Sequence, residues 1–405
     1  TASLGKIEMT GYDASNLTGM MEKVTAGATA ALGSIEMTGY SSDNLSSMVE
    51  MVTSGATAAM GSIQMTGFSS DNLTSMVEMV TAGATSSLGK ITMTGYNASD
   101  LTGMMEKVTA GATASLGKIE MTGYDASNLT SMMEKVTAGA TAALGSIEMT
   151  GYSSDNLAAM VSQVTAGATS ALGNIQMEGF SSDNITNITI NITISTTNSL
   201  SNITMIGFNP ENISSDITNS AASGAWVGMT NLQSKSSAPL ISNVTSSTSN
   251  GNYNAGKNIF ISLNFNKPVN VDNSNGSPTM ILETGSTDRL ATYSSGTGST
   301  SINFTYTVQS GDVSSDLDVK SNNSLLLNGA TIKSADNESA ILFIPTGVAT
   351  NSLSSNKAIV VDTLVPSVNS VAISSASGVQ NSLLNAGDNV SVTATFSESV
   401  IVDNA

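Results

Sequence analysis

DASNLTGMMEKVTAGATAALGSIEMTGY, residues 13–40, is the stretch that decides the fold of the first half of this chain, because it returns every 28 residues. Its closing phrase, M-T-G-Y or a close variant, begins at Met9, Met37, Met65, Met93, Met121, Met149, Met177 and Met205. A fixed interval of this length is typical of stacked-repeat proteins, in which each unit buries its apolar side only against its neighbours. The sequence therefore predicts a solenoid.

The first part of the repeat has the spacing of an amphipathic helix. Apolar residues recur at intervals of three and four between Ser15 and Leu32, which predicts a helix of about five turns. Asp13 and Ser15 offer oxygens for the N-cap, and Gly33 follows the last apolar residue, where a left-handed C-cap favours glycine. Gly27 returns at the same place in later units, so we expect neighbouring helices to approach closely there. The alternative is two short helices broken at T-x-G-A-T.

The end of the repeat reads as a short strand. The segment Ile35-Glu36-Met37-Thr38 alternates apolar and polar residues, which is the period of a half-buried strand. The predicted fold class is therefore an α/β solenoid, with one strand and one antiparallel helix per repeat and all strands in one parallel sheet. The L-x-x-I-x-M-x-G-Y run resembles the strand portion of leucine-rich repeats. The expected core of each unit consists of the positions of Leu17, Met20, Met21, Val24, Leu32, Ile35 and Met37.

The chain divides into four expected segments. Residues 1–180 hold the regular repeats, and residues 181–235 hold degenerate repeats that we expect to cap the solenoid, including Trp226. An N-I-T-rich run within this cap reads as strand rather than helix. Residues 236–364 change to short alternating strands, and residues 365–405 begin a second copy of that pattern. Because the chain opens and stops inside repeated units, we expect it to be a section of a longer polypeptide.

The third segment carries strand patterns bounded by Gly, Asn and Asp turns. Residues 259–265, 280–282, 302–308 and 359–361 read as strands, and their spacing predicts an antiparallel sandwich. The phrases N-A-G-K-N-I, F-N-K-P-V-N-V, P-T-M-I-L-E-T-G and N-K-A-I-V-V-D-T-L-V-P resemble bacterial Ig-like (cadherin-like) tandem modules of giant secreted surface proteins and adhesins. The resemblance implies a stalk of beaded sandwiches that projects other domains, and it implies no catalytic residues.

Composition argues against several classes of function. The chain has no Cys and no His, which removes thiol nucleophiles, disulfides and the commonest general base. It carries 13 basic and 31 acidic residues, a formal charge of −18, so its surface repels phosphate backbones and no nucleic-acid partner is expected. No apolar run is long enough to predict a membrane span in this segment. The richness in Ser, Thr, Asn and Gly is frequent in secreted bacterial surface proteins.

Two kinds of site are candidates. Oxygen-rich loops suit Ca²⁺, and the acids of G-D-V-S-S-D-L-D could hold one together with Asp362 or Asp272, although solvated turn acids are the simpler interpretation. The candidate calcium ligands are Asp312, Asp316, Asp318 and Asp362, and no other cofactor is expected. N-x-S/T sequons are numerous, and the candidates for glycosylation are Asn184, Asn187, Asn191 and Asn202.

Three columns of residues recur with the repeat. The column of Glu8 gives each acid a similar environment, so no pair with distinct pKa values for acid–base catalysis is expected. The column of Thr10 would resemble an ice-binding face, but the neighbouring column of Glu and Gln breaks the flat pattern, and Thr is favoured on any pleated strand face. The column of Met20 falls on the apolar stripe, so we expect it to fill the core rather than bind a soft metal.

These observations favour a non-enzymatic structural or adhesive segment of a giant bacterial cell-surface or extracellular fibre protein. The alternatives are a self-assembling filament or surface-layer subunit, and a carbohydrate- or ice-binding repeat surface. Expected partners are further copies or neighbouring domains of the same long chain, and a surface glycan or protein ligand. We expect no enzymatic activity, because the sequence does not supply a nucleophile together with a base.

Overall fold

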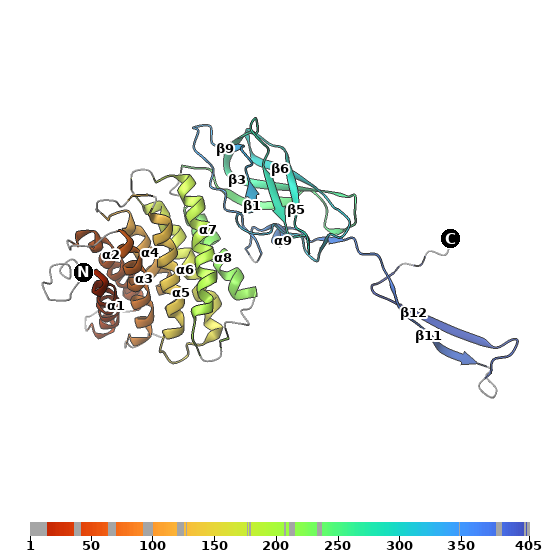
Figure 1. Ribbon diagram of the computed structural model, residues 1–405, viewed down its shortest axis with the longest axis horizontal. Helices are drawn as coiled ribbons and strands as arrows, with labels where there is room; N and C mark the ends of the chain where they lie inside the picture. Colours follow the sequence, from red (N-terminus) through yellow and green to blue (C-terminus); the bar gives the residue numbers. More distant parts are fainter. Residues whose placement is uncertain are drawn as a thin grey trace.

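The structure is a computed structural model of the 405-residue chain. It runs from a stack of helices, through an all-β unit of mainly antiparallel sheet, to a separate C-terminal hairpin (Figure 1). The residues that the structure describes are 14–35, 42–63, 70–91, 100–119, 125–126, 128–175, 177, 180–205, 208–209, 215–232, 237–347, 349–377, 383–400 and 402.

Each repeat forms one long helix. The helices are α1 (Ala14–Ala31), α2 (Ser42–Ala58), α3 (Ser70–Ser87), α4 (Leu101–Leu116), α5 (Leu129–Ala143), α6 (Leu157–Ala171), α7 (Ser182–Ser199) and α8 (Ser215–Leu232). Most of them run on into a single 3-10 turn, such as Leu144–Ser146 after α5. Because the helices continue through the mid-repeat glycines, the alternative of two short helices broken at T-x-G-A-T is wrong.

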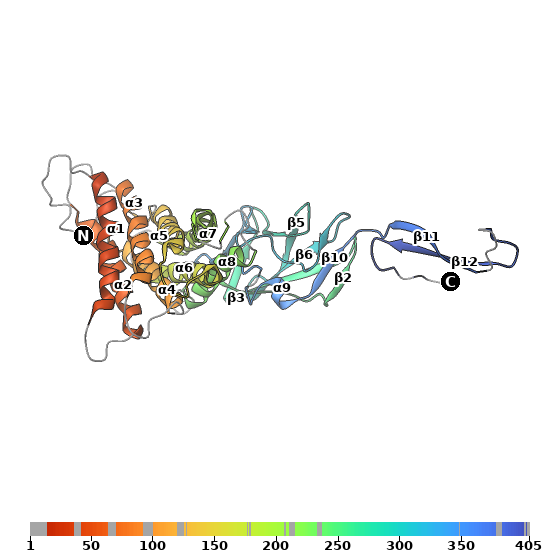
Figure 2. The same ribbon diagram turned by 90° about the horizontal axis from the view of Figure 1, so that it is seen from below.

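The helices stack in two rows (Figures 1 and 2). Each helix packs most extensively on the helix two repeats away, so α1, α3, α5 and α7 form one row and α2, α4, α6 and α8 form the other. Successive helices run in opposite directions. The end of one helix and the start of the next lie in the same apolar cluster, as Leu32 after α1 and Leu45 of α2 do. The structural unit is therefore a pair of repeats that folds as an antiparallel helical hairpin.

The α/β solenoid with a parallel sheet is wrong. Among the described residues, strands occur only from Ile241 onward, and they pair antiparallel except for one pair. The segment expected to be a strand is fully described at 147–150, where it is an extended connector that turns at Gly151. The alternation of this segment reflects burial against the helices rather than pairing in a sheet, because Ile147 belongs to a helical core cluster and Glu148 is exposed.

The N-I-T-rich run is also a helix rather than a strand. It forms α7, and together with α8 it completes the two rows. Its isoleucines at Ile185, Ile188 and Ile192 recur at helical spacing and are buried. β-Branched residues are weak helix formers, but burial of this stripe against α5 overrides that preference.

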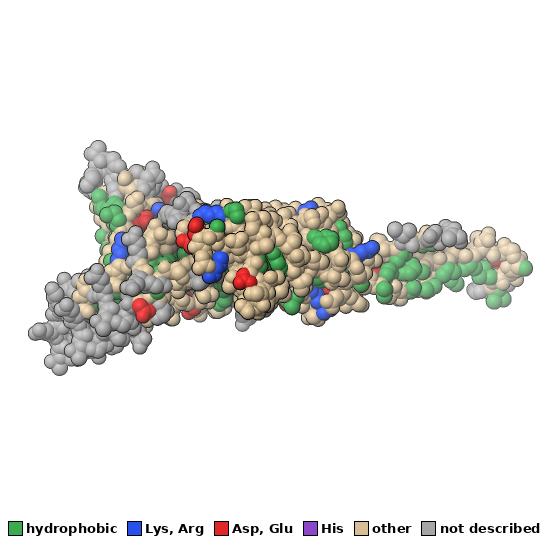
Figure 3. All heavy atoms as spheres, turned by 90° about the horizontal axis from the view of Figure 1, so that it is seen from above, with side chains coloured by type: hydrophobic (Ala, Val, Ile, Leu, Met, Phe, Trp, Pro, Cys, Tyr) green, Lys and Arg blue, Asp and Glu red, His purple; other side chains and the backbone are tan. Residues whose placement is uncertain are grey.

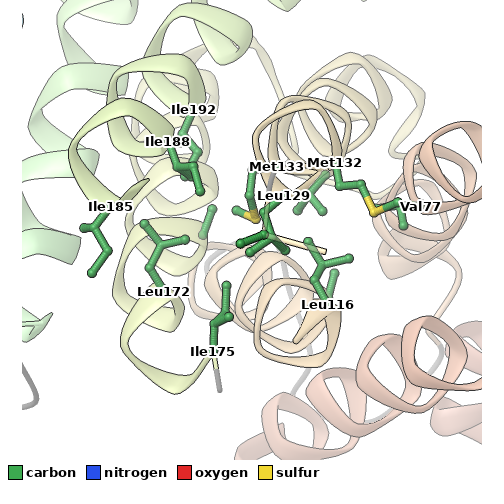
Figure 4. Packing of buried hydrophobic residues seen from close by; sticks show 14 of the residues in the cluster. Val77, Leu116, Leu129, Met132, Met133, Leu172, Ile175, Ile185, Ile188 and Ile192 are labelled. Atoms are coloured by element: carbon green, nitrogen blue, oxygen red, sulfur yellow. The ribbon is translucent and has the colours of Figure 1, made fainter. Parts of the chain in front are cut away.

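The helical core divides into two apolar clusters. One cluster joins the N-terminal halves of the odd-numbered helices to the C-terminal halves of the even-numbered ones, and the other joins the opposite halves. Figure 4 shows part of the first, with Leu129 and Met133 between Leu116 and Ile188. The Met column fills this core as expected, since Met132 and its equivalents Met104 and Met160 are at most 1% exposed.

In the first repeat the expected core positions differ in exposure. Met21 and Leu32 are buried, and Met20 and Ile35 are half-buried. Val24 is 42% exposed because α1 is the first helix of its row. Leu17 and Met37 lie outside the side chains that the structure describes.

The C-terminal half is an all-β unit with its own core. Its larger sheet runs in the order β1 (Ile241–Ser246), β3 (Asn258–Asp272), β6 (Ser299–Thr307), β5 (Arg289–Ser295), β4 (Thr279–Leu282) and β8 (Leu325–Leu326), and β9 (Thr331–Lys333) also pairs with β3. The smaller sheet contains β2 (Gly251–Tyr253), β10 (Ile359–Asp362) and β7 (Val313–Ser314), and one turn of helix, α9 (Leu353–Asn356), precedes β10. The four strands expected from the sequence fall in β3, β4, β6 and β10.

A two-stranded hairpin follows the β-unit. Strands β11 (Val368–Ser377) and β12 (Asn389–Phe396) pair only with each other in the described part of the chain. Val371, Ile373 and Val392 are each more than 60% exposed, and Figure 3 shows hydrophobic side chains along this hairpin. An isolated hairpin is marginally stable in water, so the hairpin is the least protected element of the described structure.

Candidate functional site

The contact between helices two repeats apart is the most regular site in the chain. A Cβ added to Gly83 of α3 would lie 2.5 Å from the carbonyl oxygen of Glu22 in α1. Gly139 of α5 meets Glu78 of α3 in the same way. Any side chain at these positions would push the helices apart, so the close approach of helices expected at the mid-repeat glycine is confirmed. The helix that approaches each glycine is the one two repeats earlier in the chain.

Ion pairs cross the same interface. Lys107 Nζ lies 3.1 Å from Glu50 Oε2, and Lys135 Nζ lies 2.8 Å from Glu78 Oε2. All four side chains are partly exposed, and such pairs contribute at most about 1 kcal/mol. They therefore favour the correct register of the helices more than they stabilise the fold.

The two threonines of T-x-G-A-T differ in their hydrogen bonding. Thr137 Oγ1 donates to the Met133 carbonyl one turn earlier at 3.1 Å. Thr141 is fully buried, and its hydroxyl has no hydrogen-bond partner among the residues that the structure describes. The same holds for Thr29, Thr57, Thr85, Thr113 and Thr169. A buried hydroxyl without a partner costs about 1–3 kcal/mol, so each repeat carries a small, regular destabilising element.

The phrase M-T-G-Y closes one helix and starts the next. The Tyr152 hydroxyl donates to the carbonyl of Leu144 at 2.9 Å, and burial raises the pKa of this tyrosine. Ser153 then caps the next helix turn, and its N–H donates to the side chain of Asn156 at 2.9 Å. Ser153 occupies the position of Asp13, which itself lies outside the described residues. The left-handed C-cap expected of Gly33 is wrong in the described repeats, because its equivalent Gly117 has a φ of −69°.

The helical stack and the β-unit share one apolar cluster. Trp226 and Met229 of α8 belong to the same cluster as Leu240 and Phe343 of the β-unit. The Leu342 N–H also donates to Thr186 Oγ1 of α7 at 3.1 Å. The two halves of the chain therefore meet through a packed core.

A cleft of about 500 Å³ opens beside this junction. Phe180 and Ile185 line it from the stack, and Ser237, Asn337 and Glu338 line it from the β-unit. The Ser237 hydroxyl donates to Glu338 Oε1 at 2.8 Å. The cleft presents hydroxyl, amide and carboxylate groups that can form hydrogen bonds with a polar ligand.

The candidate calcium ligands do not converge. Asp312 and Asp318 are buried in separate hydrogen-bond networks, and Asp362 Oδ1 accepts the N–H of Leu364 at 3.1 Å. Burial raises the pKa of Asp316, whereas Asp272 Oδ1 accepts the N–H of Ser274, which lowers its pKa. Within the described residues, no group of three acids, Cys or His could hold a metal ion. Calcium binding stays a prediction.

Asp312 is the centre of a buried polar cluster that sequence reasoning missed. Its carboxylate accepts hydrogen bonds from Arg289 Nε at 2.7 Å, the Tyr306 hydroxyl at 2.6 Å and the Gln309 N–H at 2.8 Å. Burial opposes ionisation, but these donors outweigh it and keep the pKa of Asp312 below 3.8. The one signal in the sequence is that Arg289 is the only Arg of the chain, placed where a strand begins.

Asp318 has a positioning role near the junction. Its Oδ2 accepts hydrogen bonds from the Gly347 N–H and the Ser354 hydroxyl, both at 2.8 Å. Gly347 has a φ of +61° and lies against the side chain of Asn219 in α8. Burial raises the pKa of Asp318, and its hydrogen bonds only partly oppose this. The carboxylate thus ties down the loop that faces the helical stack.

The four candidate glycosylation sites lie on α7 and the 3-10 turn that follows it. Asn187 and Asn202 are exposed, whereas Asn184 and Asn191 are half-buried. Asn184 Oδ1 accepts the Ser181 N–H at 2.9 Å, so this side chain belongs to a helix cap. Glycosylation of these residues stays a prediction.

The repeated acid and threonine columns lie on no strand where the structure describes them. Glu148 and Thr150 are exposed on the connector before α6 and lie on no strand. Other members of both columns, such as Glu8 and Thr10, lie outside the described residues. The sheet that would have carried an ice-binding array of threonines is therefore absent from the described part of the repeats.

A comparison with known protein families, curated proteins and solved structures finds no match to this chain. Among the described residues, no helix is both long and apolar enough to span a membrane.

Proposed function

We propose that this chain is a structural, adhesive segment of a bacterial cell-surface or extracellular fibre protein, and that it has no enzymatic activity. The observation that carries the proposal is the apolar cluster shared by the helical stack and the β-unit, which contains both Trp226 and Phe343. A packed core at this junction lets the stack be held at a fixed orientation and lets force pass between the two halves. Both properties suit a segment that projects or holds other domains.

The shape and composition support the same function. The stack, the β-unit and the hairpin follow one another along the longest axis (Figure 2). Repetition of one helical hairpin extends the stack without requiring a new core, since each unit buries its stripe against the next. Hydroxyl and amide side chains dominate the polar residues, which suits a surface that contacts glycans or proteins through many weak hydrogen bonds.

The first experiment tests whether the junction is rigid. Trp226 is the only Trp and is 3% exposed, so its fluorescence reports on the junction alone. In the full chain, the fluorescence transition and the helical circular dichroism transition are expected to coincide on heating. Phe343→Ala should destabilise the junction by about 3 kcal/mol and separate the transitions. Separate transitions in the unmodified chain would contradict a rigid connection.

The second experiment tests adhesion directly. Beads coated with the full chain are expected to be retained under flow on polysaccharide or protein surfaces, compared with beads coated with albumin. Electron microscopy of the same material should show separate rods. Regular polymers would favour a filament subunit instead, and saturable turnover of a polysaccharide or peptide would overturn the non-enzymatic proposal.

A further inference from the structure

Two helices of nearly identical sequence have different surroundings. Residues 17–31 of α1 and 129–143 of α5 differ at one position only, where Gly19 corresponds to Ser131. In α5 the stripe that faces α3 is buried, and Val136 is 0% exposed. In α1 the equivalent Val24 is 42% exposed. The difference arises from position in the stack, because α1 is the first helix of its row.

The second helix repeats this contrast. Met51 of α2 is 70% exposed, and a Cβ at Gly55 would meet nothing within 4 Å. The equivalent Gly111 of α4 lies against the backbone of Glu50 and the side chain of Thr53. Gly27 of α1 is likewise open. We call this surface the open end face, and it consists of Lys23, Val24, Gly27, Ala28, Ala31, Met51 and Gly55.

The opposite end of the stack is covered. There α7 and α8 pack on the β-unit through the junction of Trp226, Phe343 and the Thr186–Leu342 hydrogen bond. The two ends of the stack therefore differ, and among the described helices it is α1 and α2 that present the bare side of the repeat-stacking interface.

We propose that the open end face docks a further pair of helices of this same 28-residue repeat. The internal contact of α3 with α5 supplies the geometry, since α1 and α5 share one stripe. In the docked state the Gly27 backbone meets a glutamate carbonyl, as Gly139 meets that of Glu78. Lys23 pairs with the carboxylate of that glutamate, as Lys135 pairs with Glu78 at 2.8 Å. Val24 becomes buried, and Met51 becomes partly covered, as its equivalent Lys107 in α4 is where α4 packs on α2.

The chain itself allows a close test of this docking. Residues 113–129 are identical to residues 1–17. A copy of residues 57–112 fused ahead of Thr1 therefore reproduces the natural junction and places copies of α3 and α4 opposite α1 and α2. Because the chain has no Cys, Val24→Cys introduces a single thiol, whose rate of reaction with a disulfide reagent reports exposure of the face.

Labelling of Val24→Cys is expected to be fast in the 405-residue chain and at least about tenfold slower in the extended chain, because reaction then requires local opening. Val136→Cys is the buried control and should react slowly in both chains. Val227→Cys, at a position 45% exposed, is the exposed control and should react equally fast in both. Gly27→Leu should restore fast labelling of the extended chain, because the leucine occupies the space of the incoming carbonyl.

Two outcomes would overturn the proposal. One is equal labelling of Val24→Cys in both chains, which would show that the added helices do not cover the face. The other is slow labelling of Val24→Cys in the 405-residue chain when that chain also has the mass of a dimer in solution. This result would show that a second copy of the chain occupies the face instead. Neither result bears on adhesion, so the docking proposal and the proposed function can fail separately.

Discussion

Gly139 of α5 lies against the carbonyl oxygen of Glu78 in α3, so closely that no Cβ fits between them. The same helical sequence at Gly27 of α1 meets open space. One residue type in one sequence context therefore has two different roles, and position in the stack decides between them.

Alanine at these two glycines should have effects of opposite sign on stability. Gly139→Ala forces α3 and α5 apart and is expected to lower the free energy of unfolding by about 1–3 kcal/mol. Gly27→Ala improves helix propensity without a clash, so it should raise the free energy of unfolding by up to about 1 kcal/mol. Urea unfolding followed by circular dichroism measures both. Equal effects of the two substitutions would contradict the described packing.

The paired threonines give a second matched test. Thr141→Val removes a buried hydroxyl without a partner in the described structure, so it should raise the free energy of unfolding by about 1 kcal/mol. Thr137→Val removes a hydroxyl that is bonded to the Met133 carbonyl, and it should be neutral or mildly destabilising. Thermal unfolding of the two variants is the measurement. A stabilising effect confined to Thr137→Val would be inconsistent with this assignment.

Arg289 should govern the acid stability of the β-unit. The pKa of Asp312 lies below 3.8 when folded, so its ionised form adds stability that is present above about pH 3.8 and is lost as the pH falls below it. Arg289→Met removes the cation but leaves Asp312 buried, so the pKa of Asp312 should rise. The free energy of unfolding at pH 7 should fall by about 3 kcal/mol.

Urea unfolding between pH 3 and 7 checks this expectation, and Lys320→Met is the control. Lys320 pairs at the surface with Glu283 and Asp288, where solvent screens the interaction, so its loss should change the stability much less than the loss of Arg289. If both variants lost the same stability at pH 7, the buried ion pair would have no special role.

The C-terminal hairpin should be cleaved before the β-unit. Strands β11 and β12 expose both faces and lack a packed core, whereas β3 and β6 bury alternate residues. Thermolysin is expected to cut first within 365–402 and leave a resistant fragment that ends near Asp362. Mass spectrometry of early time points identifies the cuts. Initial cleavage within β3 or β6 would argue against the described core.

Sequence reasoning identified the parts of the site that depend on local chemistry. The spacing of apolar residues identified the helix of each repeat, and the recurring glycine at Gly27 indicated close approach of helices. The capping position was correct at Ser153, and four strands of the β-unit were found from alternation. The Arg289–Asp312–Tyr306 cluster was not found, because its members come from separate strands and a turn.

Period and composition by themselves determined that this chain is a repeat array followed by a β-unit, because 3.6-residue and two-residue periodicities are local properties of the backbone. Only the tertiary structure decided what each apolar stripe packs against. A stripe such as Met132–Val136–Leu144, followed by the buried Ile147, is equally compatible with a helix on a sheet and with a helix on other helices. The structure resolves this choice, because the stripe packs on the helix two repeats away. The mid-helix glycine, as at Gly139, lets the two backbones approach closely enough to bury the stripe without a sheet.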